Sequence, residues 1–150
     1  MTTRQIEIAL AWRFNFRTNT IVPNVSWGLM LHECDMLVVT PSNYAYEIEI
    51  KISKGDLKAD LLKKHHHISD KIRALYFCIP EKLKDCVDLI PKEAGIIICS
   101  EGNFLYELRK PIKRKSVRIT ESERLHLLHL GCMRIWGLKR KIEKLRTANV

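Results

Sequence analysis

Three side chains in the first third of the chain have the types and spacing expected of a divalent-metal site. Asp35 lies near the start of one strand-like segment, and Glu49 and Lys51 lie near the end of the next. If residues 41–43 form the connecting loop, counting back along both strands places Asp35 opposite Glu49. Directly opposed residues of an antiparallel pair have Cβ atoms about 5 Å apart, and two carboxylates that close repel each other. A bound Mg²⁺, which prefers oxygen ligands, removes that repulsion.

Lys51 adds an amine to this pair of carboxylates, because side chains two residues apart on a strand share one face. An ammonium beside a metal-bound water can orient or activate that water and offset charge on an attacked phosphate. Glu7, on an expected N-terminal helix, could add a further carboxylate. The alternative is that Glu47, Glu49 and Lys51 form the solvent-facing side of a half-exposed sheet. Spacing alone does not choose between these two interpretations.

Two further acids lie beside the expected ligands. Glu33 is two residues before Asp35, and Glu47 is two residues before Glu49. A shift of register would let either acid replace a ligand. In the expected register, we interpret both as groups that support the site or face solvent.

The hydrophobic pattern places these residues in an α/β fold. Thr2 or Thr3 caps a first helix that runs to about residue 16, and Ser53 caps a second helix over 54–65. Thr120 and Glu123 form a capping box that opens a final helix, which runs to about residue 146. Period-two alternation and short apolar runs predict strands at 20–23, 25–31, 34–40, 44–52, 73–80 and 94–100, with 103–109 paired to the last.

Length and composition indicate one domain in a reducing compartment. The chain has 150 residues, of which 46% are hydrophobic and 29% charged, an ordinary mixture for a globular protein. No apolar run approaches the roughly 20 residues of a membrane-spanning helix, and the first residues do not resemble a signal peptide. The five cysteines are widely spaced and form no C-x-x-C pair, which favours reduced thiols. We therefore expect a cytoplasmic protein, in a bacterial cell or a phage-infected host.

Positive charge is concentrated in the last third of the chain. The net charge is +9, and residues 109–146 contain 13 basic and three acidic residues. Such asymmetry favours a polyanionic partner such as DNA over a solvated basic surface. The expected phosphate contacts are in an exposed arm and near the end of the second helix: Arg109, Lys110, Lys113, Arg114, Lys115 and Arg118, with Lys63, Lys64 and His65.

A histidine tract and an apolar stripe leave alternatives open. His65, His66 and His67 point about 100° apart if helical, so they cannot all bind one ion. We interpret them as a solvated or DNA-facing helix end. The final helix carries apolar residues at three- and four-residue steps, which need a partner surface. The parent domain or a second copy of the chain could supply it, so a homodimer is a hypothesis. The stripe consists of Leu125, Leu128, Cys132, Ile135, Leu138, Ile142 and Leu145.

The span that contains Asp35, Glu49 and Lys51 resembles the D…(D/E)-x-K motif of the PD-(D/E)XK nuclease superfamily. The segments EIEIKISKGDLKAD (47–60), LYFCIP (75–80) and AGIII (94–98) are similar to the MmcB-like DNA repair branch and related phage proteins. The resemblance spans roughly residues 4–115, is strong from Asp35 to Pro80 and is weak in the final helix. Cys34 stands where the motif's name has a proline.

This resemblance implies a restriction-endonuclease-like core, with a mixed central sheet flanked by helices, over residues 1–119. Residues 120–150 would be an appended basic amphipathic helix. The implied activity is metal-dependent hydrolysis of DNA phosphodiester bonds, by an endonuclease in phage or bacterial DNA processing or repair. Two other functions are compatible with the sequence. One is a non-catalytic DNA-binding accessory protein on the same fold, and the other is an adaptor whose basic helix binds an acidic protein.

The resemblance also assigns roles at the site. Asp35, Glu49 and the Ile50 carbonyl would hold Mg²⁺ or Mn²⁺. Lys51 would orient or activate the attacking water. Glu7 would be a second-metal or water-mediated ligand.

Overall fold

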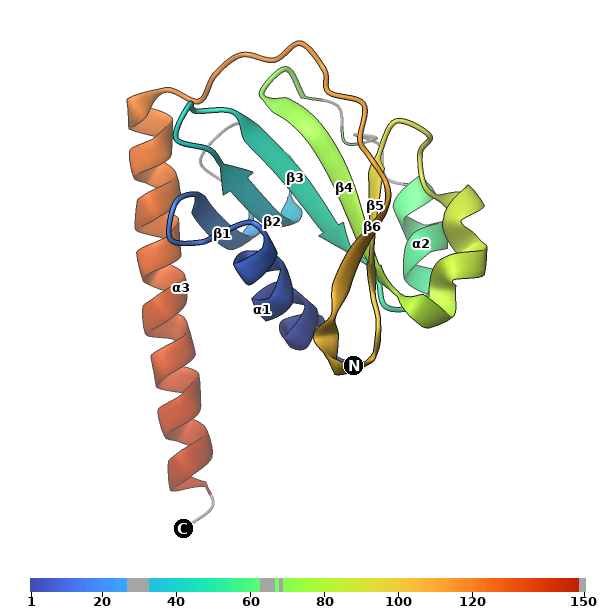
Figure 1. Ribbon diagram of the computed structural model, residues 1–150. Helices are drawn as coiled ribbons and strands as arrows, with labels where there is room; N and C mark the ends of the chain where they lie inside the picture. The colour runs from blue at the N-terminus through green and yellow to red at the C-terminus, as the bar shows by residue number, and fades with distance from the viewer. Residues whose placement is uncertain (27–32, 63–66, 68, 149–150) are drawn as a thin grey trace.

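The protein contains one six-stranded mixed sheet whose spatial order follows the chain, β1-β2-β3-β4-β5-β6 (Figure 1). The computed structural model describes residues 1–26, 33–62, 67 and 69–148. Strands β3, β4 and β5 run parallel to one another, and the other neighbouring pairs are antiparallel. The strands are β1 (Thr20–Val25), β2 (Cys34–Val39), β3 (Ala45–Ile50), β4 (Ile72–Pro80), β5 (Gly95–Cys99) and β6 (Leu105–Arg109).

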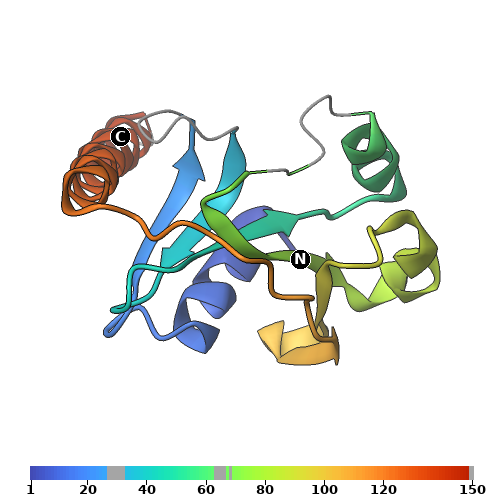
Figure 2. The same cartoon turned by 90° about the horizontal axis from the view of Figure 1, so that it is seen from above.

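Helices cover both faces of this sheet (Figure 2). Helix α1 (Thr3–Arg13) packs Ile6 and Leu10 against one face. On the other face, α2 (Lys54–Leu61) and the 3₁₀ helix η1 (Glu81–Leu89) pack over β4 and β5, and α3 (Glu121–Thr147) lies beside β1. A short 3₁₀ turn, η2 (Glu101–Asn103), joins β5 to β6. This arrangement is the α/β fold expected from the sequence.

The expected helix caps are confirmed. The side chain of Thr2 accepts a hydrogen bond from the backbone N–H of Gln5, and Ser53 accepts one from the N–H of Asp56. Thr120 forms a capping box with Glu123. These bonds satisfy N–H groups that have no partner inside the helix, so the local sequence is sufficient to define each start.

The register expected between β2 and β3 is also confirmed. Thr40 N–H donates to the carbonyl of Tyr44 over 2.9 Å, and Met36 pairs with Ile48. One further step along both strands brings Asp35 opposite Glu49. A tight local connection determines this register, because each strand continues directly from the turn.

Some expected boundaries are wrong. Residues 20–23 and Val25 belong to a single strand, β1, which passes through Asn24 with a φ of +51°. Helix α1 ends at Arg13 rather than residue 16, because Asn15 takes a φ of +50° and turns the chain. Helix α2 ends at Leu61. The rest of the strand expected at 25–31 falls largely on residues outside the described part of the chain.

Residues 110–119, here called the basic strap, cross the sheet at the starting ends of its parallel strands (Figure 1). Backbone N–H groups of the strap donate to carbonyls next to those starts: Ile112 to Glu93, Arg114 to Arg73, Val117 to Asp70 and Ile119 to Asn43. The expected exposed arm is therefore tied to the sheet through its main chain, while most of its side chains face outward.

Helix α3 packs against β1 through a different face from the expected stripe. Leu127 and Leu130 are buried, and Ile119 joins the same cluster. Arg124 anchors this end of the helix by donating to Thr40 O and Thr20 Oγ1. The residues of the expected stripe are exposed, although Leu128, Cys132, Ile135 and Leu138 line a groove together with residues 16–23. The parent domain therefore covers the stripe only in part, and the second half of α3 extends past the sheet (Figure 1).

The division of the chain at residue 120 does not separate two cores, since the first half of α3 contributes to the cluster over β1. No helix in the described ranges combines the length and apolar character needed to span a bilayer.

Candidate functional site: a buried ionic cluster at the end of β3

Asp35, Glu49 and Lys51 come together, as the sequence predicts. Lys51 Nζ donates to Glu49 Oε2 and lies 3.8 Å from Asp35 Oδ2. Lys51 directly follows β3, and its backbone N–H still donates to Cys78 O on β4 over 3.0 Å. The end of the strand therefore holds the Lys51 backbone in place and directs its side chain between the two carboxylates.

The polar face of β3 is buried, so the interpretation of a solvent-facing sheet surface is wrong. Glu47 is 0% exposed, Glu49 1% and Lys51 7%. Charges buried to this extent are costly unless they are paired or bind a metal. Alternation along β3 predicts which residues share this face, while α2 and His67 cover it and exclude water.

Asp35 is oriented by the strand opposite it. The backbone N–H of Ile50 donates to Asp35 Oδ2 over 2.7 Å. A backbone donor at the end of β3 is thus satisfied by a carboxylate of β2, which directs this carboxylate toward Lys51. About a third of the Asp35 side chain remains exposed, so this group is the open side of the cluster.

Asp60 of α2 completes the environment of Lys51, and the sequence analysis missed it. Asp60 Oδ1 lies 3.0 Å from Lys51 Nζ, and the residue is 7% exposed. Asp60 follows Leu57 by three residues, so both lie on the buried side of α2. A carboxylate on the apolar side of a helix that follows an E-x-K strand is the signal that could have revealed it.

His67 extends the cluster toward the interior of the protein. His67 Nδ1 lies 2.5 Å from Glu47 Oε1, and Nε2 lies 2.7 Å from Asp60 Oδ2. The ring is 2% exposed and meets Phe77 edge-to-face, with centroids 5.7 Å apart. The expectation that His67 lies on a solvated or DNA-facing helix end is therefore wrong. A φ of +54° at His67 turns the ring inward. Glu47, treated above as a supporting or solvated group, is its buried partner.

Both cations of the cluster are held in their charged forms. Burial lowers the pKa of Lys51, but the charge and hydrogen bond of Glu49 outweigh burial and raise that pKa above its ordinary value. Burial also lowers the pKa of His67, but hydrogen bonds to Asp60 and Glu47 outweigh it and raise the pKa to about 9. Four carboxylates, including that of Asp35, still surround these two cations. The cluster therefore contains more carboxylates than basic groups.

A cleft of about 300 Å³ opens onto this cluster, lined by Asp35, Ile50, Lys51, Asp56, Ala59 and Asp60. Three of these residues, Asp35, Asp56 and Asp60, carry carboxylates, which are suitable ligands for a hard divalent cation. The Lys51 ammonium lies between the carboxylates of Asp35 and Glu49 and pairs with both. The position between these two carboxylates therefore suits a cation. Deeper in the protein, ligand atoms of Glu47, Glu49 and His67 lie within 4.8 Å of one another.

Glu7 lies on α1, across the sheet from α2, and is partly exposed. Burial raises the pKa of Glu7, the charge of Asp35 raises it further, and a hydrogen bond with Asn24 opposes the shift. Glu7 is thus close enough to Asp35 to sense its charge.

The expected phosphate-binding residues of the strap lie away from Lys51, although Arg114 reaches the His67 end of the cluster. Arg114 of the strap bonds to Arg73 O through its backbone, whereas Lys51 bonds to Cys78 O. These acceptors are five residues apart on β4, which places the strap about 17 Å along the sheet from Lys51. Lys63, Lys64 and His65 lie outside the described residues.

The six basic residues expected in the arm divide into two groups. Arg109 donates to Ala94 O and Pro91 O, Arg114 donates to His67 O, and Arg118 stacks on Tyr44. These arginines contribute to the fold. Lys110, Lys113 and Lys115 are exposed. The three lysines are therefore the strap residues best placed to contact a phosphate backbone.

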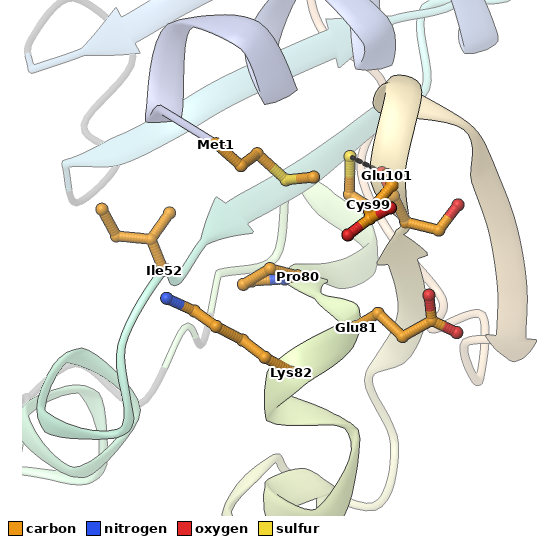
Figure 3. Close-up of a pocket in the computed structure, with 8 residues that line it drawn as sticks. Met1, Ile52, Pro80, Glu81, Lys82, Cys99 and Glu101 are labelled. Atoms are coloured by element: carbon orange, nitrogen blue, oxygen red, sulfur yellow. Dashed lines mark hydrogen bonds between the residues drawn. The ribbon is translucent and has the colours of Figure 1, made fainter.

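A larger cavity of about 610 Å³ lies past the end of β3 (Figure 3). Ile52, Pro80 and Cys99 line it from the ends of β3, β4 and β5 (Figure 3). Its charged side chains are Lys82, Glu81 and Glu101, and Met1 also lines it.

Comparison with known proteins supports the fold and does not assign an activity. No family model and no curated protein matches the sequence. A solved structure of a protein of unknown function from Silicibacter pomeroyi is similar, with a TM-score of 0.66 and 16% sequence identity. The match covers 99% of this chain and 94% of that chain, so it includes α3. The protein is thus an α/β protein with a mixed sheet, flanking helices and a long C-terminal helix.

Proposed function

We propose that this protein is a Mg²⁺- or Mn²⁺-dependent DNA nuclease, an endonuclease of the PD-(D/E)XK type that acts in phage or bacterial DNA processing or repair. The observation that carries the proposal is the convergence of Asp35, Glu49 and Lys51. Asp35 and Lys51 line an acidic cleft, and Glu49 is buried beside Lys51. A phosphate cannot approach such a cleft without a cation, because carboxylates outnumber basic groups there. Binding of a divalent ion would remove this repulsion.

The residues divide the work by position. Asp35 and Glu49, with the Ile50 carbonyl, would hold the ion, which supplies positive charge to the attacked phosphate and a more acidic bound water. Lys51, beside both carboxylates, would orient the attacking water and offset developing negative charge. Glu7, near Asp35 but on the other side of the strand end, would act through a bound water or a second ion.

The basic strap would hold DNA away from the reaction centre. Its exposed lysines lie about 17 Å along β4 from the level of Lys51, a distance that five base pairs of duplex span. Contacts with the strap lysines and with the cleft at Lys51 would fix the position of the duplex without requiring base recognition.

A non-catalytic DNA-binding protein is the second candidate. The observation that favours it is that Lys51 is already held by buried carboxylates, an arrangement that also stabilises a fold without chemistry. An adaptor that binds an acidic protein through α3 is the third.

Plasmid nicking tests the three functions. Supercoiled DNA is incubated with wild-type protein and with Lys51→Ala and Glu49→Gln, in Mg²⁺, in Mn²⁺ and in EDTA. We expect nicking by wild-type protein with either metal, none in EDTA, and a loss of at least a hundredfold in both variants. Lys58→Gln is the control for an exposed lysine of α2, and should retain activity.

The other outcomes identify the rivals. Salt-sensitive DNA binding without nicking in any divalent metal would identify the accessory protein. No DNA binding at low salt would leave the adaptor. Thermal unfolding adds a readout that does not need catalysis, because Mg²⁺ at 100 times its Kd should stabilise wild-type protein by about 2.7 kcal/mol and Glu49→Gln by much less.

A further inference from the structure

We infer that Asp60 and His67 are positioning residues, which keep the Lys51 amine beside the metal site when a divalent ion takes over the carboxylates that otherwise hold it. This inference rests on the proposed function. The contacts form one continuous chain, from Glu47 through His67 and Asp60 to Lys51.

The need for such a holder follows from competition for the same oxygens. In the structure, the ammonium of Lys51 lies among Glu49, Asp60 and Asp35. An ion bound between Asp35 and Glu49 would engage their oxygens and repel the ammonium. Asp60, which comes from α2 rather than from either ligand strand, would then be the carboxylate that still attracts the amine.

His67 determines where the Asp60 carboxylate points. One oxygen of Asp60 faces Lys51 at 3.0 Å and the other faces His67 Nε2 at 2.7 Å. His67 is anchored in turn to Glu47 in the middle of β3, and Arg114 of the strap donates to its carbonyl over 3.2 Å. The ring cannot rotate without losing two buried hydrogen bonds, so it fixes Asp60 relative to the strand that carries Lys51.

This series of contacts is shielded from solvent. Asp60 and His67 are nearly as buried as Glu47 and Glu49. Burying the carboxylate of Asp60 with a lysine and a histidine costs free energy on folding, because all three groups lose their hydration. A role in holding the amine explains why an ionic chain, rather than apolar packing, lies between α2 and β3.

The test follows the Lys51 ammonium directly. Protein labelled with ¹⁵N-lysine is examined in EDTA and in Mg²⁺, and loss of one signal in Lys51→Ala assigns the ammonium. Wild-type protein should show a slowly exchanging Lys51 ammonium that persists, at a shifted position, in Mg²⁺. In Asp60→Asn and His67→Gln, exchange should quicken several-fold in EDTA, and the signal should disappear in Mg²⁺.

Kinetics provide the second readout. In both variants, kcat for plasmid nicking should fall by about 10- to 100-fold, the usual loss when the partner of a metal-site group is removed. The KM for DNA should stay within twofold of the wild-type value. Asp60→Glu, which keeps a carboxylate, should recover part of the rate and the signal. Asp85→Asn removes an exposed charge of η1 outside the cleft, and should leave the Lys51 signal and kcat unchanged.

The outcomes separate this inference from the proposed function. Unchanged ammonium exchange in Asp60→Asn and His67→Gln, in EDTA and in Mg²⁺, overturns the inference. A second result also overturns it. If both Asp60 variants lose folded structure at 20 °C, with a lower kcat and a higher KM, the role of Asp60 is purely structural. A wild-type Lys51 signal that does not respond to Mg²⁺ or Mn²⁺ contradicts the metal site of the proposed function, while the comparison in EDTA still decides whether Asp60 and His67 hold Lys51.

Discussion

The backbone N–H of Ile50 donates to the side chain of Asp35, over 2.7 Å, at the point where β2 and β3 cease to pair. This bond gives Asp35 two separable roles. Its carboxylate satisfies a backbone donor of β3, and it also forms the open side of the cleft over Lys51.

Substitutions at Asp35 should separate these roles. Asp35→Asn keeps an oxygen that accepts from Ile50, so its free energy of unfolding in EDTA should match wild-type protein within about 0.5 kcal/mol. Asp35→Ala removes the acceptor and should lose about 1 kcal/mol. Both variants should bind Mn²⁺ at least tenfold more weakly, as measured by electron paramagnetic resonance. Wild-type Mn²⁺ affinity in Asp35→Asn would exclude Asp35 as a ligand.

The buried His67 should make stability depend on pH. Its pKa is about 9 in the folded protein and 6.5 in a model peptide. A raised pKa in the folded state means that the stabilisation is complete below pH 6.5 and is lost as the pH rises through 9. Urea unfolding in EDTA at pH 6 and pH 9.5 measures this change.

We expect wild-type protein to lose up to about 3 kcal/mol more than His67→Gln between these two pH values. Taking the difference between the two proteins removes the contribution of other titrating groups. Equal losses in both proteins would show that His67 is not held as a cation.

The exposed lysines of the strap should control the salt dependence of DNA binding. Each phosphate contact contributes about −0.9 to the slope of log K against log salt concentration. The double variant Lys113→Gln, Lys115→Gln should therefore reduce the slope by up to about 2. Lys84→Gln, which removes an exposed lysine of η1 that stacks on Tyr106, is the matched control. A slope that changes equally in both proteins would argue against binding at the strap.

The exposed stripe on the second half of α3 remains a proposed dimer contact. Leu138 and Ile142 are four residues apart on one side of the helix and are exposed. If two copies pair through them, analytical ultracentrifugation should give twice the 17.5 kDa chain mass. Leu138→Glu with Ile142→Glu should restore the monomer without loss of stability. Arg140→Glu, on the opposite side of the helix, should leave the dimer intact. A wild-type monomer at high concentration would contradict the hypothesis.

The sequence by itself determined the features that depend on neighbouring residues. The caps at Thr2, Ser53 and Thr120 require only a side chain and a nearby N–H group, and the register of β2 and β3 follows from one short loop. Alternation along β3 was sufficient to place Glu49 and Lys51 on one face. For this reason the meeting of Asp35, Glu49 and Lys51 could be predicted without coordinates.

Only the tertiary structure decided what covers that face. Strands β3 and β4 are parallel, so the chain between them must cross over the sheet, and this crossover contains α2. Burial of Glu47 and Glu49 depends on that helix. The same crossover brings Asp60 and His67 to Lys51 from positions 9 and 16 residues later in the chain. It is also the fold that places the basic strap at the far ends of the parallel strands. A periodic pattern records which side chains share a face, but burial and long-range ion pairs depend on segments that meet only after the sheet is assembled.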